Sequence, residues 1–159
     1  MSENTVMKME DKIHEFLDGD LKEIALKFAE YLNESNLAPI NVGKDSCKIP
    51  YNEHHICMIQ FEPNQWKFTF FYGDYNSEFD QDFIKTVQKN LKFCSPCHDC
   101  TGALDAMIFG ENYSNLCSQL TIQFTNPDNT TLENIKKLLE YCKDMIPNSK
   151  LYKSYHARF

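Results

Sequence analysis

Glycine, basic clusters and long apolar runs are all scarce in this chain of 159 residues. It has five glycines and no Gly-x-Gly-x-x-Gly or Walker-type sequence, which excludes the glycine-rich loops of dinucleotide and nucleoside-triphosphate sites. No stretch approaches the roughly 18 apolar residues that span a bilayer. The first residues lack a basic region followed by an apolar one, so no secretory signal is expected. We therefore expect a cytoplasmic protein without membrane association.

Positive charge is also in short supply. The formal net charge is −7, and such a potential opposes binding to nucleic-acid backbones and anionic lipids. The best basic cluster is Lys150, Lys153 and Arg158 in the tail, which is too sparse to offset it. We expect no nucleic-acid partner. A small-molecule ligand stays open, and the sequence does not fix the oligomeric state.

Cysteine, in contrast, is plentiful. The length and the hydrophobic content of 42% predict a single domain over residues 1–159 that can fold without disulfides. In the cytoplasm thiols stay reduced, so clustered cysteines indicate metal or redox chemistry before disulfides. The count of seven, an odd number, agrees with this interpretation.

The hydrophobic periodicity predicts helices and strands in alternation. The N-terminal part, 4–36, is helical, with one helix over 4–17 and a second whose cap is Asp20, completed by Glu23. Two strands over 54–61 and 66–72 follow, joined by a turn over 62–65, and then a helix over 77–91 capped by Ser77. Residues 104–109 fit a strand or a helix end, and a turn over 110–112 and a strand over 117–124 come next. The last helix begins at Thr130, which forms a capping box with Glu133, and ends at Pro147 before a tail over 150–159. This order predicts an α+β fold, an antiparallel sheet with helices mainly on one face.

The most specific motif is Cys94-x-x-Cys97-x-x-Cys100. It brings three thiols within reach of one centre, and Cys117 follows as a fourth ligand at the expected start of a strand. Zinc prefers four such ligands in a tetrahedron. His98 is the alternative fourth ligand, although its position beside Cys97 makes the reach awkward.

The same motif has other interpretations. The spacing of the three cysteines matches the first part of the bacterial ferredoxin motif, but Leu104 occupies the position of the fourth cysteine. An iron–sulfur cluster would therefore have to use Cys117. A c-type haem attachment string ending in His98 requires export, and no secretory signal is expected here. A thioredoxin-like cysteine pair requires a motif at the start of a helix after a strand, whereas this motif follows a helix. Both interpretations are therefore disfavoured. A reduced loop without metal is as consistent with the spacing as a metal site is.

The remaining cysteines and the polar residues point to no chemistry. Cys142 and Cys57 fall on buried faces and are expected in the core, whereas Cys47 is uninformative. The serines have no nucleophile motif around them, and the carboxylates lie where turns and caps use them. We therefore assign no catalytic residues, which favours a protein that is not an enzyme.

An aromatic face runs along the predicted strand 66–72. It is made by Trp66, Phe68, Phe70 and Tyr72. Core packing is the default interpretation of such a face. The alternative is a cavity for a flat apolar ligand, as in small effector-binding domains.

From residue 94 to residue 146 the sequence resembles a group of small uncharacterised cytoplasmic proteins of anaerobic low-GC bacteria. The shared features are the cysteine cluster, the string Ile108-Phe109-Gly110-x-x-Tyr113-x-x-x-Cys117, and Asn126-Pro127-Asp128 before a final helix. The resemblance implies a shared fold and no particular activity. It also implies that Cys117 belongs with the cluster.

Overall fold

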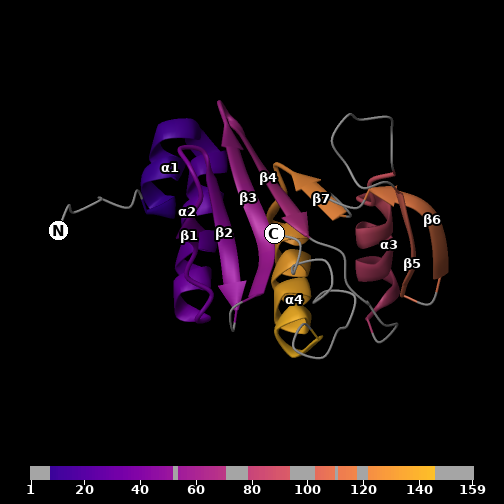
Figure 1. Cartoon of the computed structure of the whole chain (residues 1–159). Helices are drawn as coiled ribbons and strands as arrows, with labels where there is room; N and C mark the ends of the chain where they lie inside the picture. The colour runs from indigo at the N-terminus through magenta and orange to yellow at the C-terminus, as the bar shows by residue number, and fades with distance from the viewer. Residues whose placement is uncertain are drawn as a thin grey trace.

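Four helices, a five-stranded antiparallel sheet and a separate hairpin form the described part of the chain (Figure 1). This computed structural model describes residues 8–51, 54–70, 79–93, 103–109, 111–117 and 122–145. The α+β class predicted from the sequence is confirmed. Within those ranges, no helix combines the length and the apolar character that a membrane crossing requires.

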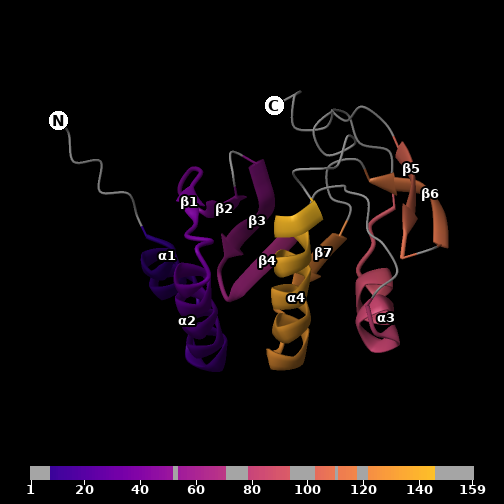
Figure 2. The ribbon, with the colours of Figure 1, turned by 90° about the horizontal axis from the view of Figure 1, so that it is seen from below.

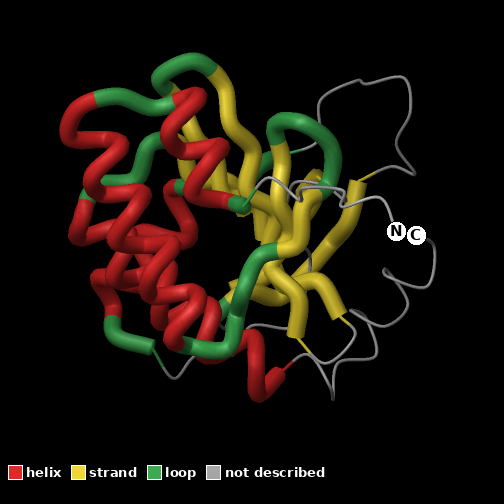
Figure 3. The backbone as a smooth tube through the Cα atoms, turned by 90° about the vertical axis from the view of Figure 1, so that its left-hand side faces the viewer, coloured by secondary structure: helices red, strands yellow, loops and turns green. Residues whose placement is uncertain are grey.

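The sheet is built from neighbours in sequence, except at one edge. Its strands are β1 (Ile40–Asn41), β2 (Ser46–Tyr51), β3 (His54–Glu62), β4 (Gln65–Phe70) and β7 (Ile122–Thr125). They pair in the order β1-β2-β3-β4-β7, with every neighbouring pair antiparallel. Figures 2 and 3 show the helices gathered on one side of the strands.

The helix-facing side of the sheet carries the aromatic core. On β4 the side chains of Trp66, Phe68 and Phe70 are fully buried, as the predicted alternation requires. Phe28 of helix α2 (Gly19–Glu34) packs on them, with its ring centroid 5.1 Å from that of Phe68 and 6.0 Å from that of Trp66. This packing fixes α2 against the centre of the sheet.

Helix ends differ from the predicted ones by a few residues. The first helix, α1, is Met9–Phe16, and α2 begins before Asp20, which therefore lies in the first turn rather than at the cap. A carboxylate there is still favourable because it faces the positive end of the helix dipole. The N-cap residue of α2 is Asp18, whose side chain makes no capping hydrogen bond.

The other two helices have aspartate caps. Helix α3 (Gln81–Lys89) starts later than predicted, and the carboxylate of Asp80 accepts a hydrogen bond from the backbone N–H of Phe83 at 2.9 Å. Helix α4 (Asn129–Met145) is capped by Asp128 rather than Thr130, because the Asp128 carboxylate accepts from the N–H of Thr131 at 2.8 Å.

The hairpin corrects the prediction for residues 110–124. Its strands are β5 (Ala103–Ile108) and β6 (Glu111–Cys117), so Cys117 ends a strand and does not begin one. A bulge at Asn115, whose φ is 65°, adds a residue to β6. Buried Leu116 therefore lies three residues after half-buried Tyr113, which hides the alternation typical of a strand.

A short extended segment joins the hairpin to the main sheet. Leu91 pairs with Ile122 of β7, and Phe93 pairs with Leu116 of β6, both in antiparallel fashion. The hairpin therefore continues the strand layer beyond β7, with α3 beside it (Figures 1 and 2).

Candidate metal centre

Both ends of the cysteine segment 94–102 are attached to the last residues of β6. At its start, Phe93 pairs with Leu116. At its end, Ala103 pairs with Cys117, and the next residue, Leu104, pairs with the other side of Leu116. The chain therefore leaves and re-enters the strand layer on the two sides of Leu116, one residue from Cys117.

These pairings bring the two flanking residues of the cysteine segment close to Cys117. Partners in an antiparallel pair have Cα atoms about 4.5–5.5 Å apart, and consecutive residues add about 3.8 Å each. The Cα of Phe93 therefore lies within about 10 Å of that of Cys117, and the Cα of its partner Ala103 within about 6 Å.

The three clustered cysteines themselves lie outside the described residues. This holds for Cys94, Cys97 and Cys100, as well as for His98, and of Cys117 only the backbone is described. Their role as metal ligands therefore stays a prediction. Within the described ranges, no group of three or more His, Cys, Asp or Glu side chains could hold a metal ion.

A hydrogen bond and a buried side chain hold the backbone that leads to Cys117. The N–H of Asn115 donates to the carboxylate of Asp105 on the facing strand at 3.3 Å, which holds the bulge. The following residue, Leu116, is fully buried. Bulges often lie beside functional sites because they redirect the residues that follow. The backbone of Cys117 thus follows a bulge and a fully buried residue at the end of β6, and it pairs with Ala103 of β5.

Three other cysteines belong to the core. Cys47, Cys57 and Cys142 are free thiols with at most 2% exposure, and the packing role predicted for Cys57 and Cys142 is confirmed. Burial raises the pKa of Cys47 to about 11 and raises the pKa of Cys57 and Cys142 as well. A thiol of this kind is a poor nucleophile and a poor metal ligand because both roles need the thiolate.

The aromatic face is packed with protein. Trp66, Phe68 and Phe70 are fully buried, Phe61 stacks on Trp66 at 6.4 Å, and Tyr72 lies outside the described residues. The indole N–H of Trp66 has no hydrogen-bond partner within the described part. Whether the face also binds a ligand stays a prediction.

Two features of this region are absent from the sequence analysis. Phe93 pairs with Leu116 and Ala103 pairs with Cys117, so each pair joins residues that are well separated along the chain. No local signal in the sequence predicts these pairs. The one available hint is the apolar Leu116 directly before a cysteine in an otherwise polar tract.

A scan against models of protein families finds no match for this chain, and searches of the curated proteins and of the solved structures find none either. The resemblance described for residues 94–146 stays an expectation, and function has to be argued from the chain itself.

Proposed function

We propose that this protein is a non-enzymatic domain with one structural zinc ion bound by Cys94, Cys97, Cys100 and Cys117. The observation that supports it is the attachment of both ends of the segment 94–102 beside Cys117, through the Phe93–Leu116 and Ala103–Cys117 pairs. Three cysteines on one short segment and a fourth at its point of attachment are the ligand set that a closed, four-thiolate zinc site requires.

A structural role fits better than a catalytic one. A catalytic zinc keeps an open position for water or substrate, whereas four cysteine ligands fill the tetrahedron. The three buried thiols of Cys47, Cys57 and Cys142 have raised pKa values, so they do not compete for the ion. The cluster alone then accounts for metal binding.

Elemental analysis of protein purified without an affinity-tag metal tests the proposal. We expect one zinc per chain and a loss of thermal stability when a chelator removes it. A zinc content near zero, together with unchanged stability in the chelator, would reject the site. A brown protein with visible charge-transfer absorbance and iron in place of zinc would assign the same cysteines to an iron–sulfur cluster instead.

A pair of variants assigns the ligands. Cys117→Ser removes a predicted ligand, and we expect it to weaken zinc binding by more than the roughly 10–100-fold that loss of an outer-shell partner costs. Cys47→Ala removes a buried thiol of β2 outside the cluster and should retain one zinc per chain. Equal zinc content in both variants would contradict the assignment of Cys117.

A further inference from the structure

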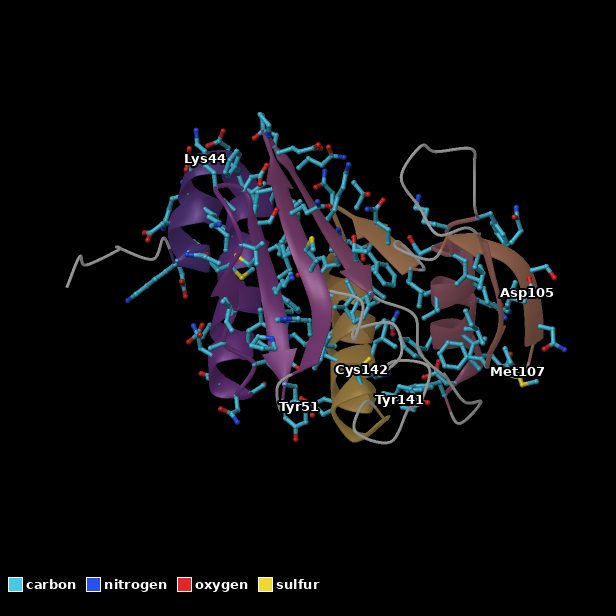
Figure 4. The ribbon with its side chains drawn as sticks, viewed as in Figure 1. Lys44, Tyr51, Asp105, Met107, Tyr141 and Cys142 are labelled. Atoms are coloured by element: carbon cyan, nitrogen blue, oxygen red, sulfur yellow. The ribbon has the colours of Figure 1, made fainter. Side chains whose placement is uncertain are left out.

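We draw no further inference here: the strongest candidate, the outward face of the β5–β6 hairpin, where Asp105 and the 55% exposed Met107 of β5 point away from the fold (Figure 4), is an exposed surface patch, and nothing among the described residues shows what covers it.

Discussion

The ammonium group of Lys12 lies in the interior, which no pattern in the sequence indicates. The side chain is fully buried, and its Nζ donates to the carbonyls of Gly43 and Ser46, each at 2.7 Å. It thereby connects α1 to the loop between β1 and β2. The carbonyl of Ser46 also accepts a hydrogen bond from the N–H of Val42, so the carbonyl of Gly43 depends more on Lys12 for its donor.

We predict that Lys12→Met lowers the free energy of unfolding by about 1–3 kcal/mol, because the stem keeps its packing while two charge-assisted hydrogen bonds, to the carbonyls of Gly43 and of buried Ser46, are lost. Urea unfolding followed by the fluorescence of Trp66, the single tryptophan, measures the change. Lys27→Met, at an exposed position of α2, is the control and should stay within about 0.5 kcal/mol of wild type. Equal stability of the two variants would show that the Gly43 carbonyl finds water when the ammonium is gone.

The cap of α4 predicts a pH dependence. The hydrogen bond from the backbone N–H of Thr131 holds the pKa of the Asp128 carboxyl below its usual value. Because the folded pKa is the lower one, this contribution is present above the unfolded value of about 3.9 and is lost as the pH falls through the folded pKa. We expect Asp128→Ala to cost about 1 kcal/mol near neutral pH and less in acid. Unfolding curves at both pH values measure this, and a pH-independent difference would contradict it.

At this scale, residue types were predicted better than positions. The sequence predicts carboxylates in turns and caps and places the two caps at Ser77 and Thr130, whereas Asp80 and Asp128 supply them. Several polar residues near each helix start have the chemistry of a cap, and only the backbone geometry selects one. The buried positions of Cys57 and Cys142 followed from periodicity, which the core enforces directly.

Among the elements, those with one regular buried face were predictable and the hairpin was not. The stripe of α4 and the alternation of β4 are both buried as expected. Strand β6 has the polar sequence Glu111–Cys117 and a bulge, so its two buried-side residues are out of phase with a period of two. Its partner, β5, was ambiguous because short apolar runs fit a strand and a helix end equally well.

The bulge itself can be tested. Asn115 has a φ of 65°, which asparagine and glycine tolerate and a β-branched residue does not. We expect Asn115→Val to destabilise the hairpin by about 1–2 kcal/mol, whereas Asn115→Gly should change its stability little. Hydrogen exchange of residues 103–109 and 111–117 reads out both variants. Equal exchange in the two would mean that the bulge relaxes without strain.

For the whole molecule, the fold class and the local pairing of β3 with β4 across their turn could be predicted, but the pairing of distant strands could not. Helix and strand patterns are local, whereas the pairs of β4 with β7 and of Phe93 with Leu116 join segments far apart in sequence. Such pairs depend on how complete layers pack, which no window of sequence contains. The same holds for the candidate metal centre. The cysteine motif could be identified in the sequence, whereas the pairing of its two flanking residues beside Cys117 is known only from the fold.

The seven cysteines give one prediction for the molecule as a whole. Three of them, Cys47, Cys57 and Cys142, are buried with raised pKa values, so seven minus three leaves at most four thiols that react quickly in the native state. With a thiol-specific disulfide reagent near pH 8, where an ordinary cysteine of pKa about 8.5 is partly ionised, we expect up to four fast thiols in the zinc-free protein.

Zinc should suppress the fast reaction, because a thiolate bound to the ion is shielded from the reagent, and denaturant should expose all seven thiols. The Cys47→Ala variant provides the control, since it should lose one slow thiol and no fast one. More than four fast thiols in the native protein would show that the core around α4 and β3 opens readily. Four fast thiols that zinc leaves unprotected would show that the cluster does not bind the ion.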